Sequence, residues 1–231
     1  MVTCRIPQPL SELDKNKTTH LHEITWRIFR IMAEFVEGFQ FLSEFSREVT
    51  IAGSARLPPE SKWYKEARKL GNYLAECGFT VITGGGPGIM EAGNRGAHER
   101  GGESVGINIQ LPFEQRTNPW VKKSRAFHYF FSRKVMLFAS AQAYVYFPGG
   151  YGTADEFFEM IELIQTKKMQ PVPLILVGKE FWAPLKAWIE ETMLHEYRTI
   201  SPQDSKLYRI VDSAEEAFEI IQNESSERTF F

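Results

Sequence analysis

The stretch AYVYFPGGYGTADEF, residues 143–157, decides the fold class of this 231-residue chain. An apolar run leads into a turn that contains three glycines, and apolar residues then return with helical spacing. This is the order of a strand, a tight turn and a helix. The stretch FTVITGGGPGIMEA, residues 79–92, repeats it. Ligands of open α/β sheets bind where such turns follow the strands, so the two turns predict a site.

Outward from these two stretches the chain keeps alternating between strand and helix patterns. Strands are predicted at residues 49–52, 79–83, 104–109, 126–129, 144–147 and 172–177. Helices are predicted at residues 61–77, 88–100, 132–141, 153–167, 182–194 and 213–222. The alternation predicts an α/β domain over residues 49–231, in which a mainly parallel sheet carries helices on both faces.

Residues 1–48 precede this domain and are predicted to form a tail and one helix. Up to about His20 the chain is polar and without periodicity, which indicates a loosely ordered tail. From His22 to Phe45 apolar residues recur every three or four positions, as in an amphipathic helix. Its phenylalanines are too many to leave in water, so we expect it to pack on the domain or on a partner subunit.

Composition excludes several classes of protein. A net charge of −2 provides no global basic field, which argues against a protein that binds nucleic acid through its phosphates. No secretory leader and no membrane-length apolar stretch occurs, and the two cysteines suit a reducing compartment, so we expect a cytoplasmic protein without a membrane partner. The five histidines have no metal-ligand spacing, so neither a metal nor a cofactor is expected.

The first glycine turn, Gly84 to Gly88, is a candidate phosphate site. Glycines let a ligand approach the backbone, and N–H groups at a helix start attract anions. Gly85, Gly86 and Gly88 are therefore predicted to bind substrate. The turn lacks the Gly-Lys-Ser/Thr ending of a Walker loop and the third glycine of a dinucleotide fingerprint. A tight turn without any ligand is the alternative interpretation.

The second glycine turn adds polar side chains to the same pattern. Its predicted substrate-binding residues are Gly149, Gly150, Tyr151, Gly152 and Thr153. The alternative is purely structural, because a Thr followed three residues later by a Glu has the spacing of a capping box. The same spacing recurs in the segment SAEE at residues 213–216. The surplus of glycine over what a cap needs favours a ligand.

A basic run contributes the third element of the candidate site. Arg133 and Lys134 open a predicted helix, where the helix dipole disfavours positive charge and an anionic partner is expected. Lys122, Lys123 and Arg125 fit a solvated face equally well. Arg133 is the stronger candidate, because a guanidinium can hold a phosphate or carboxylate through two parallel hydrogen bonds.

Taken together, PGGYGTADE, GGGPGIMEA and the Ser132-Arg133-Lys134 tripeptide resemble the Lonely Guy family of cytokinin-activating phosphoribohydrolases, from about Thr50 to Leu194. Members of this family were long labelled lysine decarboxylases. The resemblance implies a Rossmann-like fold and a homodimer or an assembly of dimers. It also implies hydrolysis of a nucleoside 5′-monophosphate to free base and ribose 5-phosphate.

The resemblance also implies roles for individual residues. Arg133 and Glu156 match the family's catalytic pair, and Lys134 matches a neighbouring substrate contact. The second glycine turn matches the phosphate loop, and Glu114 or Gln115 matches a substrate-contacting acid. The segment around these two residues, the first glycine turn and the N-terminal helix all depart from the plant pattern, which favours AMP over a cytokinin nucleotide as substrate.

The chemistry of this reaction requires a carboxylate and is helped by a nearby cation. Cleavage of an N-glycosidic bond builds positive charge on the ribose, and a carboxylate such as Glu156 can stabilise it and orient the attacking water. Arg133 stays protonated and would act electrostatically. A non-catalytic nucleotide sensor is one alternative, which the combination of Glu156 and Arg133 disfavours. A DNA-processing protein is another, which the nearly neutral overall charge disfavours. A decarboxylase would need a Schiff-base lysine, which no sequence feature identifies.

Overall fold

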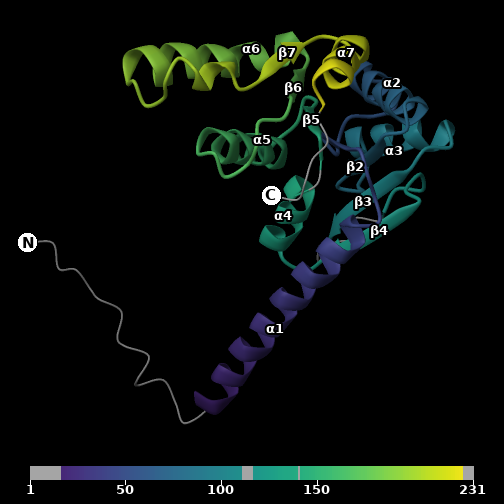
Figure 1. The fold of residues 1–231 in the computed structure, drawn as a ribbon, viewed down its shortest axis with the longest axis vertical. Helices are drawn as coiled ribbons and strands as arrows, with labels where there is room; N and C mark the ends of the chain where they lie inside the picture. The colour runs from purple at the N-terminus through teal and green to yellow at the C-terminus, as the bar shows by residue number, and fades with distance from the viewer. Residues whose placement is uncertain (1–16, 111–116, 140, 226–231) are drawn as a thin grey trace, which may run out of the picture.

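The computed structural model describes residues 17–110, 117–139 and 141–225, which fold around one sheet (Figure 1). Seven strands, all parallel, lie in the order β4-β3-β2-β1-β5-β6-β7. They are β1 (Glu48–Ala52), β2 (Thr80–Thr83), β3 (Ser104–Ile109), β4 (Lys123–Phe127), β5 (Ala143–Tyr146), β6 (Leu174–Val177) and β7 (Arg209–Val211). The predicted α/β fold with a mainly parallel sheet is confirmed.

Helices cover both faces of the sheet, each over its own apolar core. They are α1 (Lys17–Leu42), α2 (Lys62–Glu76), α3 (Ile89–Glu99), α4 (Phe130–Ala139), α5 (Tyr151–Gln165), α6 (Lys179–Ala187) and α7 (Ala214–Glu224). Helices α2, α3 and α7 share one core, and α4, α5, α6 and the end of α1 share the other. Among the described residues, no helix is both long and apolar enough to cross a membrane.

Helix α1 begins earlier than predicted and ends earlier too. Residues 17–20, predicted to belong to the loose tail, form its first turn. No proline or glycine lies between Pro9 and Gly38 to interrupt helical backbone, although the turn is polar. The helix ends at Leu42, because the next residue, Ser43, turns its hydroxyl back to donate to the carbonyl of Gln40.

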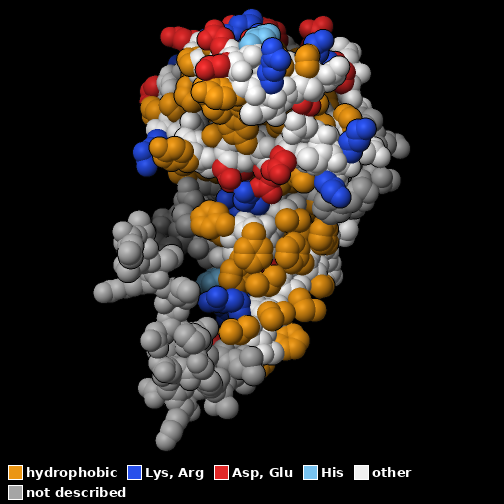
Figure 2. All heavy atoms as spheres, turned by 90° about the vertical axis from the view of Figure 1, so that its left-hand side faces the viewer, with side chains coloured by type: hydrophobic (Ala, Val, Ile, Leu, Met, Phe, Trp, Pro, Cys, Tyr) orange, Lys and Arg blue, Asp and Glu red, His pale blue; other side chains and the backbone are white. Residues whose placement is uncertain are grey.

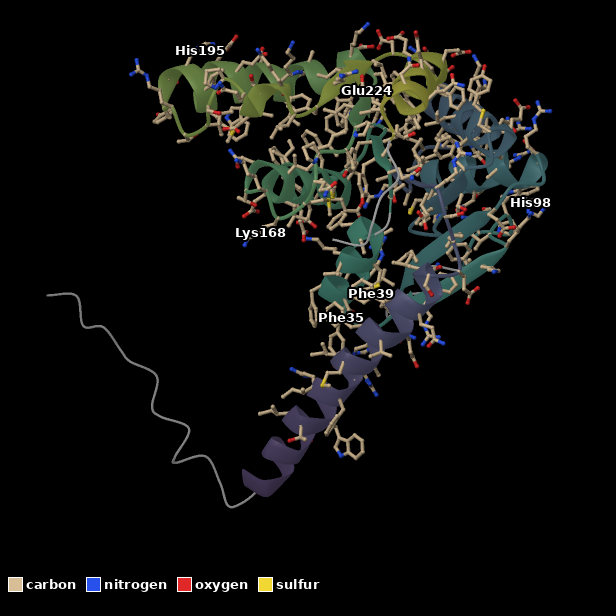
Figure 3. The ribbon with its side chains drawn as sticks, viewed as in Figure 1. Phe35, Phe39, His98, Lys168, His195 and Glu224 are labelled. Carbon is tan, nitrogen blue, oxygen red and sulfur yellow. The ribbon has the colours of Figure 1, made fainter. Side chains whose placement is uncertain are left out.

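Only the second half of α1 packs on the domain. Phe35 and Phe39 face α4 and contact its core (Figure 3). The carboxylate of Glu34 accepts a hydrogen bond from the backbone N–H of His128 and another from the hydroxyl of Ser132. The first half extends away from the sheet (Figure 1). The exposed apolar residues of α1 are Ile24, Trp26, Ile28, Phe29, Met32 and Val36. The expectation of burial on the domain is therefore confirmed for one half of the helix.

The two edge strands are the elements that the sequence pattern located least well. The strand predicted at residues 126–129 is β4, which begins three residues earlier and pairs Lys123 with Val105 of β3. Strand β7 was not predicted at all. Strand β4 is largely polar and β7 has only three residues, so neither contains the longer apolar run that marks a buried strand. In β4, Lys123 and Arg125 form ion pairs with Glu44 and Glu37, which explains charges in a strand.

The C-terminal helices differ from expectation in extent. The helix predicted at residues 182–194 begins at Lys179 and continues beyond α6 as a π-helical segment, Trp188–Glu196. A short 3₁₀ turn, Asp204–Lys206, precedes β7. These segments lie at one end of the molecule (Figure 1).

The order of the strands fixes where a ligand site can lie. The chain builds β1 to β4 outward in one direction and then returns to place β5 on the other side of β1. At such a switch point the loops after the two central strands diverge and leave a crevice at their carboxyl ends. Here those loops follow Ala52 and Tyr146.

Candidate active site

A cavity of about 1300 Å³ lies at this switch point. Its floor contains Thr50 and Ile51 of β1, and its walls come from the loop after β1, the start of α5 and the helices α4 and α6. The glycine turn at 148–152 forms one wall, as the sequence predicts for a ligand site at this edge of the sheet. The volume exceeds what one side chain could fill, so the cavity can hold a small organic ligand.

Arg133 and Glu156 meet in this cavity. Arg133 projects from α4 and Glu156 from α5, and the distance between Arg133 Nη2 and Glu156 Oε1 is 3.8 Å. The two side chains are only 12% and 16% exposed. Arg133 Nε donates to the carbonyl oxygen of Ile107 at 2.9 Å, which fixes the guanidinium at the end of β3. Gly84 leaves room for it, since a Cβ at that position would collide with Nη2.

Burial sets the electrostatics of the pair. It raises the pKa of Glu156, and the neighbouring positive charge of Arg133 opposes part of that rise. Burial also lowers the pKa of Arg133, against the opposing effect of Glu156. Tyr146 beneath them is buried, which raises the pKa of its hydroxyl and keeps it neutral. That hydroxyl donates to the backbone carbonyl of Glu156 at 3.3 Å and supports this turn of α5.

The start of α5 contradicts the capping-box interpretation of Thr153 and Glu156. The N-cap residue is Gly150, which has no side chain to cap with, and the helix begins at Tyr151. Thr153 is therefore already inside the first turn, and Glu156 lies in the second turn. The five residues from Gly149 to Thr153 all line the cavity. The first N–H groups of a helix have no intrahelical acceptor, so this turn offers an anion site.

The first glycine turn is positioned differently. Gly84 lines the cavity, whereas Gly85, Gly86 and Gly88 do not. The side-chain amide of Asn118 donates to the carbonyl oxygen of Gly86 at 3.0 Å. The backbone N–H of Asn118 donates to the carbonyl oxygen of Gly85 at 2.9 Å. Gly88 has a φ of 67° and lies against the backbone of the loop after β1. This turn is held by internal contacts, so substrate binding by its last three glycines stays a prediction.

The remaining predicted site residues lie outside the cavity or outside the described chain. Lys134 does not line the cavity, and its ammonium group instead pairs with Asp155 at 2.9 Å and with Glu159. Glu114 and Gln115 lie outside the described residues. Over residues 17–110, 117–139 and 141–225, no group of three or more potential metal-binding side chains comes together.

Sequence reasoning missed the loop after β1, which forms a full wall of the cavity. Residues 53–57 line it, together with Trp63 and Phe181. The backbone N–H of Ser54 donates to the carbonyl of Pro148 at 3.0 Å, which joins this loop to the second glycine turn. The loop has no glycine-rich motif to mark it. Its signal lies in the strand order, because β1 is one of the two strands at the switch point.

Comparisons with known proteins show which family this chain is similar to. A family model described as "Possible lysine decarboxylase" matches residues 90–221. A probable cytokinin riboside 5′-monophosphate phosphoribohydrolase of Oryza sativa subsp. japonica is 33% identical over 67% of this chain and 63% of its own. A pyrimidine/purine nucleotide 5′-monophosphate nucleosidase of Escherichia coli (strain K12) is 31% identical over 67% of this chain and 36% of its own. The chain thus spans less than two thirds of the length of these relatives.

A solved structure shares the fold. The molybdenum cofactor binding protein of Rippkaea orientalis superposes with a TM-score of 0.56 and 21% identity, over 76% of this chain and 94% of its own. At this identity the likeness concerns the fold alone.

Proposed function

We infer the function of this chain from its family: it belongs to the Lonely Guy family, whose model is described as possible lysine decarboxylase. Distant relatives at about 30% identity are named nucleotide 5′-monophosphate phosphoribohydrolases and nucleosidases. We propose that this chain is such an N-glycosidase. It hydrolyses a nucleoside 5′-monophosphate, AMP or a cytokinin riboside 5′-monophosphate, to free base and ribose 5-phosphate.

One observation carries the proposal: a buried carboxylate and a guanidinium meet in a cavity beside a helix start that suits a phosphate. In the reaction the bond between the base nitrogen and ribose C1′ breaks, and its electron pair leaves with the base. Oxygen from water bonds to C1′ in its place, one water proton is released, and the leaving base takes up a proton. Positive charge on the ribose is largest between these events.

Glu156 and Arg133 have separate roles in this scheme. The carboxylate of Glu156 stabilises the positive ribose and orients the attacking water. Arg133 lowers the energy of the ionised carboxylate, which burial disfavours, and its bond to Ile107 keeps it in place. Positioned acid–base help contributes about 10²- to 10⁴-fold, so binding energy from the phosphate must supply a further part of the catalysis. The residues 149–153 would provide that anchor.

The direct test follows base release from purified protein by chromatography. AMP should release adenine without added metal or cofactor and with activity retained in EDTA. Adenosine should be a far poorer substrate because it has no phosphate for the start of α5 to bind. GMP, CMP, IMP and isopentenyladenosine monophosphate establish the preference for the base. Binding of these nucleotides without turnover would identify the non-catalytic sensor, and equal rates for AMP and adenosine would contradict the phosphate anchor.

We further propose that the chain forms a homodimer or an assembly of dimers through α1. Hydrophobic side chains gather on the lower half of one face, where α1 lies (Figure 2). On α1, Trp26 and Phe29 are 62% and 56% exposed, and Phe130 at the start of α4 is 57% exposed. Monomeric proteins seldom leave such a patch in water.

The test of this interface replaces Trp26, Phe29 and Met32 with Gln, Glu and Gln in one triple variant. Sedimentation should show a smaller assembly while the melting temperature of the domain stays close to that of the parent, since these side chains contact no core. The control is Lys168→Gln in the turn that follows α5 (Figure 3). An assembly unchanged by the triple variant would contradict the proposal.

A further inference from the structure

The charges that line the cavity do not balance. Three charged side chains contribute to its wall, namely Arg56, Arg133 and Glu156. Arg133 and Glu156 pair with each other, and the nearby Lys134 pairs with two carboxylates outside the cavity. Within the described parts of the chain, no carboxylate lies within ion-pair distance of Arg56. The described residues therefore give the cavity one positive charge in excess.

Arg56 stands on a loop whose position is fixed from both sides. Its backbone N–H donates to the hydroxyl of Ser54 at 3.1 Å. The backbone N–H of Ser54 donates to the carbonyl of Pro148, and the carbonyl of Ser54 accepts from the N–H of Ile89, each at 3.0 Å. The loop is thus joined to both glycine turns. Arg56 and the second turn line the same cavity.

A phosphate in this cavity needs such a cation. A phosphate monoester carries about −1.5 to −2 charges near neutral pH. A helix start supplies the equivalent of only about +0.5 charge. Arg133 adds little to this balance, because the carboxylate of Glu156 already neutralises it at 3.8 Å. The start of α5 alone would leave most of the phosphate charge uncompensated in a partly dry cavity.

We propose that Arg56 binds the phosphate of the substrate, together with the first turn of α5. This proposal rests on the proposed function for the identity of the ligand, a nucleoside 5′-monophosphate. The guanidinium donates to two phosphate oxygens, and the N–H groups of α5 donate to the others. Arg56 thereby determines that the enzyme accepts 5′-monophosphates and rejects nucleosides.

The experiment compares Arg56→Ala, Arg56→Gln and Arg56→Lys with a matched control, Lys65→Ala. Lys65 is an exposed cation on the neighbouring helix α2 that does not line the cavity. Four quantities are measured for each protein: kcat/KM for AMP and for adenosine, and, by calorimetry, the Kd of ribose 5-phosphate and of ribose. Arg56 is exposed, so its variants should fold, and circular dichroism checks that they do.

The Ala and Gln variants should lose about 10- to 100-fold in kcat/KM for AMP and in affinity for ribose 5-phosphate, as expected for a lost charged hydrogen bond. Adenosine turnover should stay within about twofold. The Lys variant should recover part of the loss, and Lys65→Ala should match the parent.

Two results would overturn the proposal. One is an equal loss for AMP and adenosine, which would make Arg56 a structural residue, and the other is no loss in ribose 5-phosphate binding. A different result would contradict the proposed function without contradicting the role of Arg56. If the parent protein releases no base from any nucleotide but ribose 5-phosphate binds and loses affinity in Arg56→Ala, the hydrolase proposal is wrong and the role of Arg56 stands.

Discussion

Helices α5 and α7 begin with the same sequence spacing and use it in opposite ways. At α7, Ser213 is the N-cap, and its hydroxyl accepts a hydrogen bond from the backbone N–H of Glu216 at 3.2 Å. At α5, a Thr and a Glu stand at the same separation, but the helix has already begun at Tyr151, with Gly150 as its N-cap. The same four-residue pattern caps the N-terminus of α7, whereas in α5 it lines a cavity.

The difference lies in the residues that precede the pattern. Glycines at 149 and 150 let the chain turn sharply from β5, and the helix starts two residues before the Thr. Thr153 and Glu156 are then carried onto the helix face that covers the cavity, where Glu156 is 16% exposed. Glu216 remains on the surface, with 47% of its side chain exposed. A capping residue stabilises the fold, whereas a buried carboxylate costs stability and needs a functional reason.

The largest predicted effect separates the two glutamates. Glu156→Gln should abolish base release from AMP and leave AMP binding intact, because Gln keeps the size of the side chain but not its charge. The melting temperature should stay within about 4 °C, a change of roughly 1 kcal/mol for a domain of this size. Glu216→Gln, the matched variant at α7, should keep full turnover.

Three measurements on each variant decide this prediction: the rate of base release, the AMP dissociation constant and the melting temperature. If Glu156→Gln still hydrolysed AMP within about tenfold of the parent, a barrier change of only ~1.4 kcal/mol, Glu156 would have no place in the mechanism.

The next effect concerns Arg133 and the pH dependence. Glu156 must be ionised to act, and burial raises its pKa, so kcat should fall on the acid side at a higher pH than the ordinary glutamate value of about 4.3. Arg133→Met removes the charge that opposes this rise. The variant should lose on the order of 10²- to 10³-fold in kcat at neutral pH, and its acid limb should move to still higher pH.

Arg133→Lys serves as the partner variant, because it keeps the charge and should restore part of both properties. A pH–rate profile of kcat for the three proteins checks the prediction. An acid limb that stays in place in Arg133→Met would show that Arg133 does not act on the charge of Glu156.

How far the sequence predicts this molecule depends on how each element is encoded. The buried strands β1, β2, β3 and β5 span four to six residues rich in β-branched and aromatic side chains, so they are found near their observed bounds. The glycine turn before α5 predicts a cavity wall directly, because glycine there serves a backbone requirement. The short edge strands β4 and β7 carry no such signal, and pairing with a neighbour determines their extent.

The candidate site shows the same division. Residue type and motif identify Arg133 and Glu156 as candidates from the sequence. In the structure, Arg133 Nη2 and Glu156 Oε1 lie 3.8 Å apart. The loop that holds Ser54 and Arg56 has no motif, and its place in the cavity follows from strand order, a property of the whole sheet. The start of α5 could not be placed from the spacing of Thr153 and Glu156, because that spacing is equally good for a cap.

The smallest predicted effect tests the two hydroxyls. Ser213→Ala removes the cap of α7 and should cost about 1 kcal/mol, a fall in melting temperature of roughly 2–4 °C, with kcat/KM unchanged. Thr153→Val keeps the shape of the side chain and removes only its hydroxyl. Since Thr153 caps nothing, stability should be unchanged, but affinity for ribose 5-phosphate should fall by a few-fold, about 1 kcal/mol for one hydrogen bond. Urea unfolding and calorimetry on both variants measure the two properties, and a stability loss in Thr153→Val equal to that in Ser213→Ala would make the two helix starts equivalent after all.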